Sequence, residues 1–140
     1  MQKYFEILLK LAHKACKQNE VPVSALIVRN NKIIATSYNK RNKSHYIGDH
    51  AEMLVIRKAS KKLKDWRLSD CDLYVTLKPC SMCEAAIRQS RIKNVYYLMD
   101  KENYKKEYQK TNIAKANIRT IEEKYTKELS SFFKKQRDKK

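Results

Sequence analysis

Glycine and proline are scarce: the sequence contains a single glycine, Gly48, and two prolines, Pro22 and Pro79, among 140 residues. Collagen-like repeats and flexible or proline-rich linkers are excluded, because each of them needs these residues in quantity. The sequence also has no internal repeat and no low-complexity tract. We therefore expect one domain that spans residues 1–140.

Long apolar runs are missing as well. No run approaches the roughly 20 apolar residues that cross a bilayer, and Met1–Glu6 lacks the apolar core and cleavage site of a secretory signal. We expect a cytoplasmic protein without a membrane segment. Four cysteines in a reducing compartment do not form a disulfide framework. Cys16 and Cys71 stand alone in the sequence, and we interpret them as thiols that pack in the core.

Basic residues dominate the charge: 32 lysines and arginines against 15 acidic residues leave a net charge of +17. Such an excess favours polyanionic partners, because basic side chains bind phosphates and release counterions. A lysine-rich composition of the source genome would produce the same excess. The position of the basic residues is therefore more informative than their number, and the last predicted helix is among the most basic segments.

The hydrophobic pattern predicts alternating helices and strands. Helices are predicted over residues 4–17, from Asp49 or His50 to about Lys64, from Pro79 to Gln89, over 101–115, and from Thr120 onward, where Thr120 and Glu123 fit a capping box. Strands are predicted over 23–28, 32–38, 71–77 and 95–98, with a fifth before the last helix and a loop over 39–49. The strand–helix–strand passages indicate an α/β fold, in which helices cover both faces of a partly parallel sheet.

Two cysteines, Cys80 and Cys83, follow Pro79 at the start of a predicted helix. Their spacing places both thiols on one helix face, and the positive end of the helix dipole favours the thiolate form that binds metals. Two thiolates leave a zinc ion short of ligands, and His50, at the start of an earlier helix, is the candidate third ligand. Three protein ligands and a water molecule are typical of a catalytic zinc site, whereas structural sites have four protein ligands.

Glu52 follows His50 by two residues, so one helical turn would carry a metal ligand and a carboxylate that serves as general acid and base. Each motif alone is common: Cys-x-x-Cys occurs in redox motifs and structural zinc sites, and Asp49-x-x-Glu52 is typical of a helix cap. In this order, however, His-x-Glu and Pro-Cys-x-x-Cys form the signature of the zinc deaminases, in which the glutamate is not a ligand. His13 and His45 are interpreted as surface or loop histidines.

On these residues the chain resembles the cytidine-deaminase-like superfamily and, within it, the bacterial tRNA-specific adenosine deaminases (the TadA type). The matching segments are Glu20–Ala25, Ser37–Asn39, Asp49–Glu52, Leu73–Cys83, Ser90–Ile92 and Leu129–Lys134. The resemblance implies a three-layer α/β/α fold with a mixed five-stranded sheet. It also implies one Zn²⁺ per subunit, a homodimer, and conversion of adenosine to inosine at the wobble position of a tRNA anticodon.

The same resemblance assigns roles to individual residues. It implies zinc ligation by His50, Cys80 and Cys83, and proton transfer by Glu52. Contacts with a flipped-out adenosine are implied for Asn39, the backbone of Ala51, Val21 and Leu77. Contacts with the anticodon stem-loop are implied for Phe132, Phe133, Lys134 and Arg137, because single-stranded RNA is bound by aromatic stacking and basic groups.

Three features depart from the family pattern: Ser24 replaces a glycine, Lys78 replaces a glutamate, and Met99–Lys106 contains no glycine. They leave open a deaminase of a free base or nucleotide, such as cytosine, guanine or deoxycytidylate. A non-catalytic, zinc-stabilised RNA-binding module is a further alternative, in which Cys71 would be a fourth ligand and Glu52 would have no role. Core packing is an alternative to RNA contact for one of the two phenylalanines.

Overall fold

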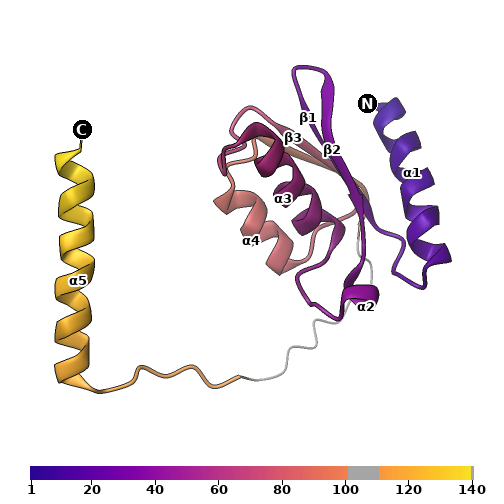
Figure 1. Ribbon diagram of the computed structural model, residues 1–140. Helices are drawn as coiled ribbons and strands as arrows, with labels where there is room; N and C mark the ends of the chain where they lie inside the picture. Colours follow the sequence, from indigo (N-terminus) through magenta and orange to yellow (C-terminus); the bar gives the residue numbers. More distant parts are fainter. Residues whose placement is uncertain (101–110, 140) are drawn as a thin grey trace. The chain divides into compact units, whose positions relative to one another are not determined.

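The computed structural model describes residues 1–100 and 111–139 (Figure 1). The chain divides into two compact units, Met1–Tyr104 and Lys105–Lys140. The first unit holds the sheet and the residues of the expected metal site, and the second holds helix α5 (Arg119–Asp138). The single domain expected from the sequence stays a prediction. None of the described helices is long and apolar enough to cross a membrane.

Within the described residues, one mixed sheet contains four strands in the order β2-β1-β3-β4. The strands are β1 (Ser24–Arg29), β2 (Lys32–Tyr38), β3 (Asp72–Leu77) and β4 (Asn94–Met99). β1 pairs antiparallel with β2 and β3, and β3 pairs parallel with β4. Asn30 and Asn31 connect β1 to β2 with φ angles of 51° and 60°, a left-handed conformation that asparagine tolerates better than most residues.

Helices cover both faces of the sheet, as the sequence predicts (Figure 1). Alternate residues of a strand point to opposite faces, so β1 sends Leu26 and Val28 toward α1 (Gln2–Lys17) and sends Ala25 and Ile27 toward the other helices. α3 (Ala51–Leu63) and α4 (Ser81–Gln89) cover this second face. A short helix, α2 (Arg41–Ser44), lies between β2 and α3.

Ser24, which departs from the family pattern, connects β1 to α1. Its side chain is fully buried, and its hydroxyl donates a 2.6 Å hydrogen bond to the carbonyl oxygen of Leu8. A buried hydroxyl is tolerated only when it has such a partner. The substitution is therefore accommodated within the packing of the fold.

Several details differ from the sequence-based expectation. Cys16 is exposed on α1 rather than packed in the core. Residues 116–118, which lie between the two last expected helices where the fifth strand was expected, form no strand, since their side chains are exposed and no apolar burial stabilises pairing. The N-cap of α5 is Ile118, without a side-chain cap, because Thr120 already lies inside the helix. α4 begins at Ser81 rather than Pro79, with Cys80 as its extended N-cap. Of the helix expected over 101–115, residues 101–110 lie outside the described residues, and 111–115 are not helical.

Candidate active site

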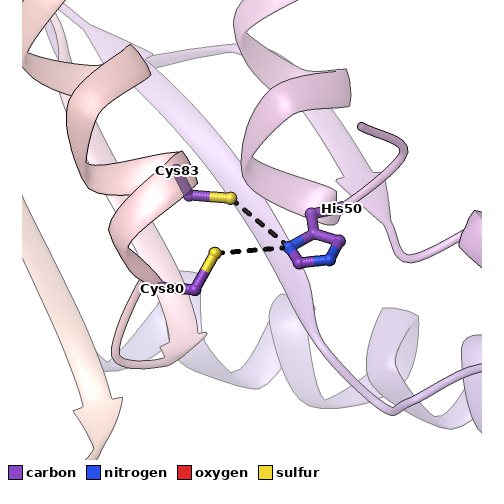
Figure 2. Close-up of side chains that lie close together, drawn as sticks. All are labelled: His50, Cys80 and Cys83. Atoms are coloured by element: carbon purple, nitrogen blue, oxygen red, sulfur yellow. Dashed lines mark hydrogen bonds between the residues drawn. The ribbon is translucent and has the colours of Figure 1, made fainter. Parts of the chain in front are cut away.

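The three expected metal ligands converge at the starts of two helices. His50 is the N-cap of α3, Cys80 is the N-cap of α4, and Cys83 lies in the first turn of α4. The Nδ1 atom of His50 lies 3.6 Å from Sγ of Cys80 and 3.5 Å from Sγ of Cys83 (Figure 2). All three ligand atoms lie within 4.8 Å of one another. Residues 30 positions apart in the chain thus form one cluster.

These separations fit a single metal ion. Zinc binds sulfur at about 2.3 Å and nitrogen at about 2.0–2.1 Å, so tetrahedral ligands of these two kinds lie roughly 3.6 Å apart. The observed distances of 3.6 and 3.5 Å from Nδ1 to the two sulfur atoms match that value. The donor atoms, two sulfurs and one imidazole nitrogen, are also of the kind that zinc prefers. The cluster could therefore hold a metal ion.

Cys71 is not part of this cluster. Among the described residues, the metal-binding group contains only His50, Cys80 and Cys83. Cys71 directly precedes β3 and is fully buried in the apolar core, whereas Cys80 follows the other end of the same strand. A strand of this length separates its two ends by about 20 Å. The alternative that Cys71 completes a closed structural zinc site is therefore wrong.

The two clustered thiols differ in their protonation. Hydrogen bonds from Cys83 and from His50 lower the pKa of Cys80 to about 3. The hydrogen bond to Cys80, together with burial, raises the pKa of Cys83. The metal-free cluster therefore holds a thiolate at Cys80 and a thiol at Cys83. A metal ion would displace the remaining proton, because it binds the deprotonated sulfur.

Glu52 is a buried carboxyl in the first turn of α3, with only 3% of its surface exposed. Its Oε1 atom has no hydrogen-bond partner among the described residues. Burial raises the pKa of Glu52, because desolvation disfavours the charged form. The N-cap of α3 is His50 and makes no side-chain cap bond, so the arrangement is not the capping box that Asp49-x-x-Glu52 suggested. A buried carboxyl with one oxygen that lacks a partner is typical of a group that interacts with a ligand.

A cavity of about 460 Å³ opens beside this cluster. Its lining includes His50, Glu52 and Cys80, and also Val21, Asn39 and Leu77, three of the residues expected to contact the substrate. The fourth, Ala51, is fully buried, and its backbone N–H donates a 2.8 Å hydrogen bond to Oδ1 of Asn39. The structure thus brings the predicted ligands, acid/base and substrate residues together in one place.

The expected RNA-contact residues lie on α5, in the second unit. Phe132 and Phe133 are each 55% exposed, and their ring centroids lie 5.5 Å apart in a T-shaped arrangement. Lys134 and Arg137 follow on the same helix and are exposed. The helix therefore presents aromatic and basic side chains together.

Several cavity residues were not singled out from the sequence: Glu20, Val23, Arg41, Asn42, Met99 and Asp100. Glu20 is buried, and its two carboxylate oxygens accept hydrogen bonds from the backbone N–H groups of Asn42 at 2.9 Å and Lys43 at 2.8 Å. A charged residue between Asn19 and Val21 carries no sequence signal for this role, because its partners are main-chain groups more than 20 residues away.

Comparison with known proteins agrees with the geometry. The family model of the MafB19-like deaminases matches residues 1–137. The tRNA-specific adenosine deaminase of Buchnera aphidicola subsp. Schizaphis graminum is 36% identical over 145 aligned positions, which cover 96% of this chain and 94% of that protein. The tRNA-specific adenosine deaminase of Rickettsia bellii is 47% identical over 91 residues, 64% of this chain. The chain spans 63% of the length of this second relative, which is less than two thirds.

Two solved structures are similar in fold. A structure from studies of A-to-I editing by tRNA:A34 deaminases has a TM-score of 0.67 and 42% identity, and the match covers 69% of this chain and 74% of that one. Guanine deaminase from Bacillus subtilis has a TM-score of 0.68 and 35% identity, with 71% and 64% covered. The TM-scores and identities show that this chain shares its fold with both structures. The chain belongs to the MafB19-like deaminase family, among the tRNA-specific adenosine deaminases.

Proposed function

We propose that this protein is a zinc-dependent hydrolytic deaminase that converts adenosine to inosine at the wobble position of a tRNA anticodon. The observation that carries the proposal is the buried carboxyl of Glu52, which lines the same cavity as His50 and Cys80 and whose Oε1 atom has no hydrogen-bond partner among the described residues. Relatives that are named tRNA-specific adenosine deaminases support the choice of substrate.

His50, Cys80 and Cys83 would hold the zinc ion, one per subunit. When bound, zinc polarises a water molecule and lowers its pKa to about 7. Glu52 would accept one proton of the water molecule and deliver it to N1 of the adenine ring, and it would then transfer the second proton of that water to the departing amine, which leaves as ammonia. The raised pKa of Glu52 suits this role, because a general acid works best when its pKa lies close to the working pH.

The cavity would hold the target base after it leaves the stack of the anticodon loop. Val21 and Leu77 would provide apolar walls, and the amide of Asn39 would contact the base or its ribose. The backbone N–H of Ala51 donates a hydrogen bond to the side-chain oxygen of Asn39, and this bond holds the amide in position. The small volume, about 460 Å³, suits one nucleoside rather than a folded stem.

The RNA loop would contact Phe132, Phe133, Lys134 and Arg137 on α5 through stacking and phosphate contacts. Replacing Phe132 and Phe133 together by leucine should weaken RNA binding about tenfold or more, since stacking contributes about 1–3 kcal/mol per base. Ile121→Ala, an exposed apolar residue on the same helix, is the matched control. We also propose a cytoplasmic homodimer, which sedimentation of the full chain tests directly.

Ammonia release from the zinc-loaded protein tests the proposed reaction. The substrates are an anticodon stem-loop with adenosine at the wobble position, the same stem-loop with guanosine there, and free guanine, cytosine, adenosine and deoxycytidylate. Activity restricted to the adenosine stem-loop supports the proposal. The similarity to guanine deaminase makes guanine the main competitor, and turnover of guanine without turnover of RNA would overturn the assignment.

A further inference from the structure

Two cationic residues, Arg41 and Lys78, line the same cavity as Glu52. Arg41 begins α2, which follows β2, and Lys78 directly follows the end of β3. Because β2 and β3 flank β1 in the sheet, the two residues reach the cavity from either side of the central strand. Neither residue belongs to the metal cluster or to the substrate contacts considered above.

Three acidic side chains also line the cavity, those of Glu20, Glu52 and Asp100. Both oxygens of Glu20 accept backbone hydrogen bonds, from Asn42 and Lys43. Glu52 is buried, with 3% of its surface exposed. Asp100 is the remaining acidic residue in the described lining, and it is exposed. Arg41 and Lys78 are exposed, whereas Glu20 and Glu52 are buried, so a ligand at the opening meets both cationic groups but only one exposed carboxylate, which favours an anionic ligand.

Arg41 lies next to the catalytic cluster. Its Nη1 atom is 3.4 Å from Nε2 of His50, while Nδ1 of the same ring faces the two sulfur atoms. A histidine that binds a metal through Nδ1 carries its hydrogen on Nε2, and such a nitrogen cannot accept a bond from a guanidinium. The guanidinium of Arg41 would then be available to an anion, and its fork of N–H donors matches the oxygens of a phosphate.

Hydrogen bonds hold the backbone around Arg41 and at Lys78 in place. Glu20 fixes the first turn of α2 through Asn42 and Lys43, and the side chain of Asn42 donates a 2.9 Å bond to the carbonyl oxygen of Asn19. The N–H of Lys78 donates a 3.0 Å bond to the carbonyl oxygen of Met99. Fixed main-chain positions reduce the entropy that is lost when a ligand is bound.

We propose that Arg41 and Lys78 form a phosphate clamp, a pair of specificity-determining residues that bind the phosphates flanking the target nucleoside. The inference rests on the proposed function and makes its substrate more specific. The clamp favours a nucleotide within an RNA chain over a free base. Lys78 belongs to the clamp because it lines the cavity and directly follows β3.

Binding of a fluorescent anticodon stem-loop to the full-length protein tests the clamp, with Glu52→Ala as the background that prevents turnover. Arg41→Gln and Lys78→Gln should each weaken binding about tenfold. Each should also reduce the slope of log K against log salt by about one. Lys10→Gln and Lys61→Gln, exposed lysines on α1 and α3, are charge-matched controls with smaller expected effects. Arg41→Lys and Lys78→Arg should recover part of the affinity, which a purely structural role would not predict.

Methylphosphonate linkages on either side of the target nucleoside provide the second arm, because they remove the phosphate charge without altering the base. The neutral linkage should weaken binding to the background protein but not to the Arg41→Gln, Lys78→Gln double variant. Equal losses in both proteins would overturn the clamp, as would variants that bind like the lysine controls. Those results would leave RNA deamination intact, whereas wild-type activity on free bases alone would overturn the proposed function itself.

Discussion

The side-chain oxygen of Asn39 accepts a 2.8 Å hydrogen bond from the backbone N–H of Ala51. The first N–H groups of a helix have no partner within the helix, and Asn39 satisfies one of them from the end of β2. This bond connects the loop after β2 to the helix turn that carries His50 and Glu52. Asn39, which is expected to contact the substrate, therefore also positions the first turn of α3, beside His50 and Glu52.

Asn39→Ala tests this structural role. The variant leaves the buried N–H of Ala51 without its acceptor, and the free energy of unfolding should fall by about 1–3 kcal/mol, as measured in urea. Asn39→Asp keeps an oxygen at the same position, so it should retain most of that stability. The aspartate removes the amide N–H donors, however, and should still raise KM for RNA. Wild-type KM in the aspartate variant would mean that Asn39 has only the structural role.

Glu52→Gln should abolish deamination while the metal remains bound. The glutamine preserves the shape of the buried side chain but cannot carry a proton, and general acid/base catalysis contributes about 10²–10⁴-fold. Metal content by mass spectrometry and ammonia release from RNA are the two measurements. Glu6→Gln, which removes an exposed carboxyl from α1, should leave both unchanged. Near-native turnover by Glu52→Gln would exclude Glu52 as the acid/base.

The stability of the metal-free protein should depend on pH through Glu52. Burial raises its folded-state pKa above the ordinary value of 4.5, so the unfolded chain releases this proton at a lower pH than the folded chain does. Stability is therefore lost as pH rises from about 4.5 through the raised pKa. Glu52→Gln should remove this loss, and its advantage over wild type in urea unfolding should grow with pH above 4.5. An advantage that is constant from pH 4 to 8 would contradict the prediction.

Replacing the cluster residues should release the metal. His50→Ala, Cys80→Ser and Cys83→Ser each leave two ligands, and the purified variants should contain less than a tenth of the wild-type zinc. Cys71→Ser and Cys16→Ser are matched controls and should keep the full zinc content, since neither cysteine belongs to the cluster. Loss of zinc on replacing Cys71 would support the hypothesis of a closed structural zinc site with Cys71 as the fourth ligand, which the geometry contradicts.

Alkylation should distinguish the thiols of the metal-free protein. With its pKa lowered to about 3, Cys80 is a thiolate at pH 5, and it is partly exposed. Iodoacetamide at pH 5 should therefore label Cys80 well before Cys71 and Cys83, which are buried and have raised pKa values. Peptide mass spectrometry identifies the labelled residue. Added zinc should protect Cys80, and labelling that zinc does not slow would argue against metal binding there.

Much of the fold followed from the hydrophobic pattern. The period-2 and period-3.6 signals placed β1, β2, β3 and β4 within a residue or two of their observed bounds. β1 and β3 bury alternate side chains under helices on opposite faces of the sheet. The predictions of secondary structure failed in a segment whose side chains are exposed to solvent. Residues 111–118 are exposed and form no strand. The capping box expected at Thr120 is not formed, because the N-cap of α5 is Ile118, which makes no side-chain cap bond.

The amino-acid sequence by itself predicted the chemistry: the spacing of His50 and Glu52, and of Cys80 and Cys83, indicates a metal-dependent deaminase, because spacing within a helix start is a local property of the chain. Only the tertiary structure decided that Cys71 is separate from the cluster and that Glu20 anchors α2. The tertiary structure also showed that Arg41 and Lys78 line the same cavity. These relations join segments whose distance is set by the pairing of β1, β2 and β3. Pairing register is a long-range outcome of core packing, and local patterns do not contain it.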